Sequence, residues 1–142
     1  MLSKKSKYGL KAMLELAAEE SGQRPIQASE LAERQRLPKK FLEAILLELT
    51  RHGLLQSKLG RGGGYVLARK PGDITVGEII RLLEGPLALI PCVSKTAYQK
   101  CRDCPYTDHP QCPVQHVMGT VRDAIAGILD HYTLADFAAR QG

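Results

Sequence analysis

Four cysteines lie close together in the second half of this 142-residue chain. They are Cys92, Cys101, Cys104 and Cys112, which gives the spacing C-x8-C-x2-C-x7-C. Thiolates are soft ligands that suit an iron–sulfur cluster or a zinc ion. The pair Cys101 and Cys104 is the most specific part, because two thiolates so close in sequence can hold one metal atom without closing a long loop. His109 and His116 are nearby substitutes for a cysteine ligand.

Thiol chemistry without a metal is the alternative for the same segment. Oxidation can join Cys101 to Cys104, or Cys92 to Cys112, in a disulfide that changes the pose of the following helix. Zinc would make the segment structural, and the absence of any ligand would leave four free thiols in a polar loop. A catalytic C-x2-C pair is disfavoured, because such redox sites belong to βαβ units and the chain shows no such pattern.

The charge of the chain is concentrated in its first half. The whole chain carries 20 Lys and Arg against 15 Asp and Glu, a net charge of +5. Residues 1–75 hold 14 of the basic and 8 of the acidic residues, whereas residues 76–142 hold 6 and 7. A basic half suits a polyanionic partner. We therefore expect any nucleic-acid surface to lie within residues 1–75.

Apolar residues recur at helical spacing along most of the chain. The segments expected to be helical are about 6–20, 28–34, 39–51, 75–84, 113–132 and 133–137. Residues 54–59 and 65–68 are expected to be two strands joined by a glycine-rich tip. Pro38 is expected to be the first residue of the third helix. With 44% hydrophobic and 5% aromatic residues, the chain fits one mainly α domain with a small β-hairpin.

The order helix, tight turn, helix, β-hairpin is that of a winged helix-turn-helix, in which the second helix of the motif enters the major groove of DNA. Lys39, Lys40 and Glu43 lie near the start of that helix. There, lysines can reach phosphates and a carboxylate can accept a hydrogen bond from cytosine. Phe41 is expected on the apolar face of this helix, beside Leu42.

The hairpin tip adds a second candidate surface. Lys58 and Arg61 flank it, and an arginine between glycines can enter a minor groove because nothing bulky surrounds it. Consecutive glycines also let backbone N–H groups approach phosphate. The candidate DNA-binding residues are Lys39, Lys40, Phe41, Glu43, Lys58, Arg61, Gly62, Gly63 and Tyr65.

Other classes of function fit the sequence less well. The run Gly60-Arg61-Gly62-Gly63-Gly64 lacks a following Lys-Ser/Thr and precedes a strand rather than a helix. It is therefore not the phosphate-binding loop of an enzyme. The chain has no stretch of 18 apolar residues and no signal-peptide pattern. We therefore expect no membrane partner, a cytoplasmic location and no enzymatic activity.

Residues 2–137 resemble the IscR/NsrR-type family of bacterial winged helix-turn-helix transcription regulators. The segments that carry the resemblance are 2–10, 31–35, 41–43, 52–54, 60–67 and 74–80. The resemblance implies a homodimer built on the long helix 113–132, which reads a pseudo-palindromic double-stranded DNA operator. Glu43 matches a position that reads bases in the IscR-like members. Leu59 stands where such members carry an arginine, so operator preference does not transfer.

The same resemblance implies an iron–sulfur cluster in the cysteine segment, of either the 2Fe–2S or the 4Fe–4S type. Cys92, Cys104 and Cys112 match the three cysteines of that pattern. The fourth ligands of the family are absent, because Gln115 and Lys7 stand at the positions of a histidine and an aspartate. Cys101 is then the expected fourth ligand of an all-cysteine site.

Three units follow from this reading. Residues 1–85 are expected to form the winged helix-turn-helix, residues 86–112 a sensor loop with no secondary structure of its own, and residues 113–142 a dimerisation helix with its tail. The expected function is that of a DNA-binding regulator whose operator affinity depends on an iron–sulfur cluster or on the redox state of the loop.

Overall fold

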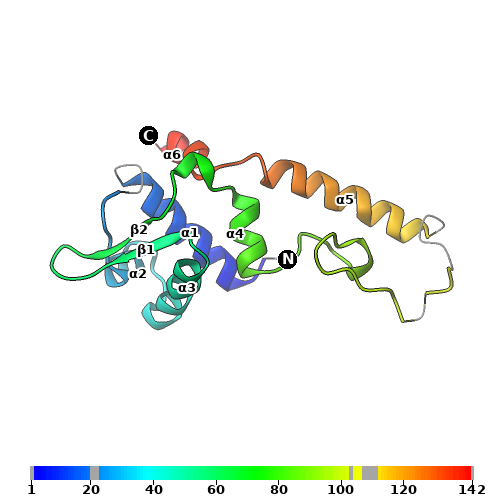
Figure 1. Cartoon of the computed structure of the whole chain (residues 1–142), viewed down its shortest axis with the longest axis horizontal. Coiled ribbons are helices and arrows are strands. Elements are labelled where there is room, and N and C mark those ends of the chain that lie inside the picture. The colour runs from blue at the N-terminus through cyan, green and yellow to red at the C-terminus, as the bar shows by residue number, and fades with distance from the viewer. Residues whose placement is uncertain (1, 20–22, 103, 107–111, 142) are drawn as a thin grey trace.

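The computed structural model describes residues 2–19, 23–102, 104–106 and 112–141. His109, a predicted substitute ligand, lies outside the described residues. The helices are α1 (Lys4–Ala18), α2 (Ala28–Gln35), α3 (Lys39–Arg51), α4 (Val76–Leu83), α5 (Pro113–Leu129) and α6 (Leu134–Gln141), with short 3-10 helices η2 (Pro71–Asp73) and η3 (Pro91–Val93) and strands β1 (Leu55–Lys58) and β2 (Gly64–Leu67) (Figure 1).

Helices α1, α2 and α3 surround the main hydrophobic core. Leu16 of α1, Leu31 of α2 and Leu46 of α3 are fully buried in it. Arg36 follows α2 in the left-handed region, with φ 54°, and turns the chain toward α3. Pro38 precedes α3 as its N-cap, so its predicted place as the first helical residue is wrong. Its backbone stays extended at ψ 122° while its carbonyl already accepts the first helical bond.

Strands β1 and β2 form an antiparallel hairpin, as predicted. Leu55 pairs with Leu67, and Lys58 pairs with Gly64. Ile26, just before α2, extends this pairing, because its N–H donates to the Tyr65 carbonyl at 3.1 Å and its carbonyl accepts from the Tyr65 N–H at 2.8 Å. The hairpin is thereby fixed to the helical core along its second strand.

The chain after α5 returns to the helical core. The Val76 N–H donates to the Tyr132 carbonyl at 2.9 Å, and the Leu134 N–H donates to the Ile74 carbonyl at 3.0 Å. Leu134 is fully buried in the core cluster, and α6 packs against α1. Leu134 of the predicted unit 113–142 thus packs in the core formed by the N-terminal helices.

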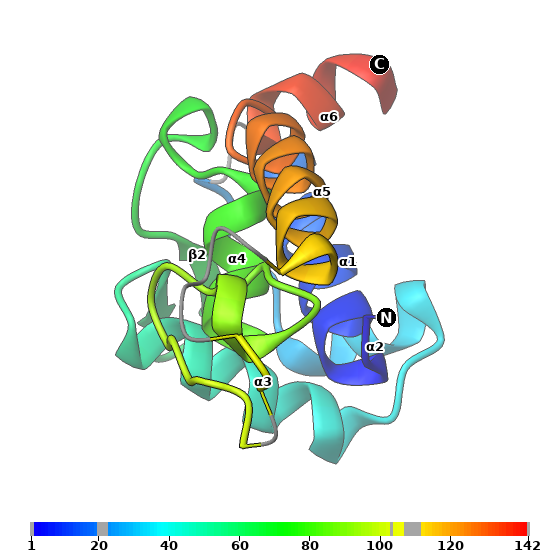
Figure 2. The same cartoon turned by 90° about the vertical axis from the view of Figure 1, so that its right-hand side faces the viewer.

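Helix α5 projects away from the rest of the structure, on the side opposite to the hairpin (Figure 1), and the loop that precedes it lies at its far end (Figure 2). None of its residues is buried. Val114, Val117 and Ile128 are 58, 53 and 59% exposed. These three residues and Val121 form the α5 stripe, an apolar strip without cover. No described helix is long and apolar enough to cross a membrane.

Candidate nucleic-acid interface and cysteine loop

The N-terminal end of α3 carries an uncovered polar surface. Lys39, Lys40 and Glu43 are exposed, whereas Leu42 and Ile45 of the same helix are buried. This is the predicted division of α3 into a core face and a free face. The Lys39 Nζ lies 3.8 Å from the Glu43 Oε1, with both side chains about half exposed. The pair is weak in water, so both groups can exchange partners at low cost.

Phe41 does not lie in the core with Leu42, contrary to the prediction. Its side chain is 40% exposed and meets the Tyr8 ring edge-on, with centroids 5.6 Å apart and planes at 81°. Consecutive helical residues point about 100° apart, so Phe41 falls at the edge of the buried face. Its contact braces α3 against α1 and leaves part of the ring available to a partner.

Residues 59–63, the hairpin loop, expose two side chains only. These are Leu59 and Arg61, and the remaining loop residues are glycines; Lys58, the last residue of β1, is exposed beside them. The Gly63 N–H donates to the Gly60 carbonyl at 3.0 Å and closes the turn. That N–H is therefore not free for a phosphate, which limits the predicted use of glycine N–H groups. A Cβ on Gly63 would lie 2.3 Å from the Lys58 carbonyl oxygen, so glycine is required there.

Gly64 and Tyr65 hold the hairpin against the core. Gly64 has φ +139°, and a Cβ there would lie 2.5 Å from the Ile26 carbonyl oxygen. The Tyr65 side chain is partly buried and packs against the core cluster. Tyr65 therefore helps to attach the hairpin to the core, and its predicted contact with DNA stays a prediction.

The cysteine loop, residues 86–112, has a short element of its own. The 3-10 helix η3 buries Cys92 and Val93, although the segment was predicted to lack secondary structure. The Cys92 carbonyl accepts a hydrogen bond from Gln115 Nε2 at 3.2 Å, and the Val93 carbonyl accepts one from Arg122 Nη1 at 2.6 Å. Both donors belong to α5, so η3 is attached to that helix.

The four cysteines differ in environment. Cys92 is buried, Cys101 is exposed, and Cys104 and Cys112 are partly buried. Cys101 and Cys104 share one turn, in which the Cys104 N–H donates to the Cys101 carbonyl at 3.4 Å. Cys112 is the N-cap of α5. Among the described residues, no three Cys, His, Asp or Glu side chains converge on one point that could hold a metal. The donor chemistry suits a cluster or zinc, but this arrangement of the loop is not a closed metal site.

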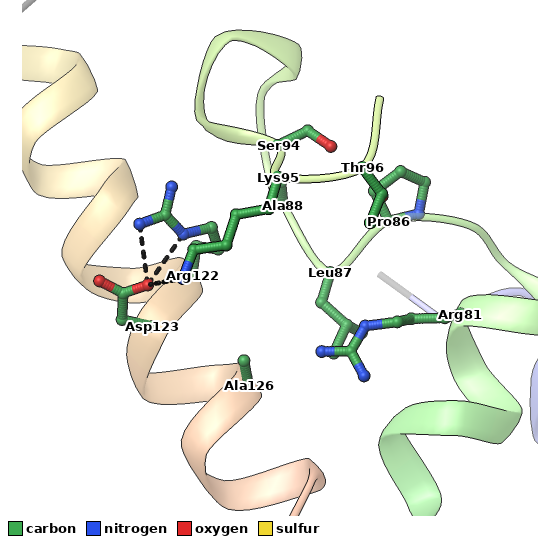
Figure 3. A pocket seen from close by; sticks show the side chains of 10 residues that line it. All are labelled: Arg81, Pro86, Leu87, Ala88, Ser94, Lys95, Thr96, Arg122, Asp123 and Ala126. Atoms are coloured by element: carbon green, nitrogen blue, oxygen red, sulfur yellow. Dashed lines mark hydrogen bonds and ion pairs between the residues drawn. The ribbon is translucent and has the colours of Figure 1, made fainter. Parts of the chain in front are cut away.

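A solvent-open pocket of about 330 Å³ lies between α4, the cysteine loop and α5 (Figure 3). Arg81 of α4 and Leu87 of the loop line one side. Lys95, Arg122 and Asp123 meet on the other side, where the Arg122 guanidinium hydrogen-bonds Asp123 and lowers the pKa of that carboxyl group. The positive groups of the pocket are thus already engaged by carboxylates.

Two long-range contacts that the sequence does not predict join α4 to the end of α5 and to the start of α1. Arg81 forms two hydrogen bonds with Asp130, of 2.5 and 2.8 Å, and they lower the pKa of Asp130. Glu84 accepts hydrogen bonds from the Ser6 hydroxyl, and from the N–H and hydroxyl of Ser3 at 3.1 and 2.7 Å. These bonds lower the pKa of Glu84 to about 2. No local pattern marks either contact, because the partners are 49 to 81 residues apart.

Comparison with known proteins gives one consistent family. Residues 2–140 match the Rrf2 family, described as an iron-dependent transcriptional regulator. An rrf2-like HTH-type transcriptional regulator of Rhodobacter capsulatus is 41% identical over 141 residues, which cover 98% of this chain and 93% of the relative.

Solved structures agree with this assignment. The structure of CymR, the global cysteine regulator of B. subtilis, is 34% identical with a TM-score of 0.80, covering 99% of this chain and 97% of that one. The structure of T. potens IscR is also 34% identical, with a TM-score of 0.77, covering 100 and 88%. These similar proteins are transcriptional regulators and not enzymes. The chain therefore belongs to the Rrf2 family and is a DNA-binding transcriptional regulator with a winged helix-turn-helix fold.

Proposed function

We propose that the chain acts as a homodimer in which α3 enters a major groove and the hairpin loop contacts the adjacent minor groove, while the cysteine loop sets the affinity for the operator. The observation that carries this proposal is the uncovered polar end of α3, which shares one rigid core with a hairpin that exposes Lys58 and Arg61. A core that fixes both elements presents them to DNA as one surface, with little ordering cost on binding.

Each element has a separate part in DNA recognition. Lys39 and Lys40 neutralise phosphates and set the position of α3, which adds affinity without sequence information. Glu43 accepts a hydrogen bond from the amino group of cytosine after releasing Lys39. Arg61 enters the minor groove between glycines that leave it sterically free. Specificity at the major groove therefore belongs to Glu43.

A second copy of the chain is the proposed cover of the α5 stripe. Three of its side chains are more than half exposed, which is unfavourable for a contiguous apolar strip in water. A self-complementary contact along α5 buries the strip and relates two winged domains by a two-fold axis. Two domains so related read two half-sites of a palindrome.

The cysteine loop is the proposed sensor. It joins the end of α4 to the start of α5 and is attached to α5 through Gln115 and Arg122. A group that draws Cys92, Cys101, Cys104 and Cys112 together would reshape the loop and shift α5 relative to α4. An iron–sulfur cluster would supply redox chemistry. The description of the Rrf2 family as an iron-dependent transcriptional regulator supports this choice. A solved structure of the oxidized form of Staphylococcus aureus CymR, 32% identical to this chain, supports direct thiol chemistry as the second candidate.

Variants of the full chain test the docking of α3. A duplex that the wild type binds is selected from a random pool, and affinities are measured by fluorescence anisotropy at several salt concentrations. Lys39→Ala with Lys40→Ala should weaken all duplexes similarly and reduce the salt slope by about 1 per lost phosphate contact. Glu43→Ala should change the preferred base pair, with about 1–3 kcal/mol lost at one position.

Lys70→Ala is the matched control, because Lys70 is an exposed lysine outside both α3 and the hairpin. It should leave affinity and salt slope nearly unchanged. Equal behaviour of Lys70→Ala and the α3 variants would refute the docking of α3.

A further inference from the structure

The hairpin loop presents one apolar side chain that the fold does not use. The Leu59 side chain is 94% exposed. The other exposed large apolar residues of the described chain have exposed fractions between 40 and 59%. Leu59 lies on the hairpin and not beside the α5 stripe, so the proposed dimer contact does not account for it. The side chain is available to whatever the hairpin loop touches.

The backbone on both sides of Leu59 is fixed by the hairpin, although its side chain is exposed. Leu59 follows Lys58, whose partner in the strand ladder is Gly64. The next residue, Gly60, accepts the hydrogen bond that closes the turn, and Gly63 packs tightly against the Lys58 carbonyl. Because the loop contains no side chains other than those of Leu59 and Arg61, any partner of its tip meets these two together.

We propose that Leu59 is a specificity-determining residue, which packs on the floor of the minor groove beside Arg61 and disfavours base pairs that carry a 2-amino group there. The inference rests on the proposed docking of the hairpin loop in that groove. A·T pairs present only acceptors in the minor groove, whereas G·C pairs add the N2 amino group of guanine. Leucine can neither accept a hydrogen bond from that amino group nor leave room for its water, so the donor loses its partner.

The expected preference follows from the chemistry of the groove floor rather than from base identity. An unsatisfied donor costs enough to lower affinity by about tenfold. Inosine·C has the major groove of G·C without the minor-groove amino group, and 2,6-diaminopurine·T has an amino group added to an A·T pair. The affinity of the wild type for inosine·C should therefore resemble that for A·T, and its affinity for 2,6-diaminopurine·T should resemble that for G·C.

The test uses the full chain and a duplex selected from a random pool. Each base pair outside the major-groove contacts is replaced in turn by A·T, inosine·C, G·C and 2,6-diaminopurine·T, and dissociation constants are measured by anisotropy. In the wild type, at least one position should favour the two amino-free pairs about tenfold. In Leu59→Ala, this ratio should fall to about twofold or less, without change in salt slope. Leu59 is exposed, so the thermal unfolding midpoint should stay the same.

The Arg61→Ala variant tests whether the hairpin loop docks in the minor groove, independently of the role proposed for Leu59. Removal of the amino group also narrows the groove, which attracts a guanidinium, so part of the preference can come from Arg61. If Leu59→Ala keeps the full ratio, or loses affinity equally for all four pairs, Leu59 does not read the groove and the proposal is wrong. If Arg61→Ala and Lys58→Ala also leave affinity and salt slope unchanged, the docking of the hairpin loop is wrong as well.

Discussion

Glu84 joins the start of the cysteine loop to the first turn of α1. Its carboxylate accepts hydrogen bonds from Ser3 and Ser6, while the Ser3 hydroxyl also caps α1 by accepting from the Ser6 N–H at 3.2 Å. The sequence predicted the helix but not this contact, since a serine near a chain start and a glutamate before Gly85 carry no common local pattern. A single side chain thus connects α4, where the loop begins, to the core helix.

Glu84→Gln should make the protein less stable at neutral pH, because a charged acceptor forms stronger hydrogen bonds than a neutral one. The pKa of Glu84 is about 2 in the folded chain and 4.5 as the ordinary value. The contribution of the Glu84 carboxylate to the free energy of unfolding is therefore present above pH 4.5 and is lost as the pH falls toward 2. The thermal unfolding midpoints of wild type and variant, followed by circular dichroism, should converge between pH 5 and pH 2.

Glu33→Gln is a suitable comparison, since it removes an exposed carboxylate from α2. It should shift the midpoint little at any pH. A difference between wild type and Glu84→Gln that stays constant down to pH 2 would contradict the role given to the carboxylate.

At the scale of the elements, α5 is joined to η3 inside the cysteine loop and, just after its C-terminal end, to α4, which precedes the loop. Asp130 ties the residue after α5 to Arg81 of α4. Gln115, in the first turn of α5, and Arg122, near its middle, tie the helix to η3. On the proposed sensor role, a change in the shape of this loop would shift α5 through these hydrogen bonds. A coupling of 1–3 kcal/mol is typical between two sites and corresponds to an affinity change of about 5- to 150-fold.

Protein purified without oxygen should contain iron and acid-labile sulfide in similar amounts and absorb visible light. Cys92→Ala and Cys112→Ala should lose both, because four thiolates are needed to hold the cluster. Loss of the cluster should change operator affinity by the factor given above. Metal analysis, absorption spectra and anisotropy on the same samples measure all three.

Thr96→Ala is the control within the loop and should keep iron and sulfide. If the protein contains zinc in a stoichiometric amount instead of iron and sulfide, the loop is a structural metal site and not a sensor. Metal-free protein whose affinity changes on disulfide formation would support the thiol alternative, and metal-free protein insensitive to oxidants would refute the sensor role of the loop. None of these results bears on DNA binding by α3.

At the scale of the whole molecule, the α5 stripe remains without cover in a single chain. The winged domain has its own core, whereas α5 has no buried residue along Pro113–Leu129. A projecting helix with an apolar strip gains stability mainly from packing, and its own propensity contributes less. In the single chain the winged domain therefore has a buried core of its own, whereas α5 leaves apolar side chains exposed to water.

Val117→Glu and Ile128→Glu should convert a dimer into monomers, because each would bury a charge in the proposed contact. Light scattering after size-exclusion chromatography should give the mass of two chains for the wild type and of one for the variants. Affinity for a duplex with two half-sites should fall strongly, whereas affinity for one half-site should change little. Leu59→Glu adds the same charge to an exposed apolar residue of the hairpin and should remain dimeric. A monomeric wild type would overturn the proposal.

The sequence by itself determined the elements whose signals lie within a few turns. The apolar spacing of α3 gave its bounds, Lys39–Arg51, and the glycine run gave the hairpin. At the start of the last helix, which was predicted from local spacing, the Thr133 hydroxyl accepts from the Asp136 N–H at 3.3 Å. These patterns are local, since helical periodicity, capping and turns depend on residues three or four apart.

Tertiary structure decided what each element lies against. It placed Tyr65 beside Ile26 and the core, returned Leu134 to the core beside α1, and joined Glu84 to the start of α1. It also moved Phe41 to the edge of the core and buried Cys92 in η3. These contacts join residues far apart in the chain, and they depend on which apolar surfaces can be buried together. Local spacing carries no record of that choice.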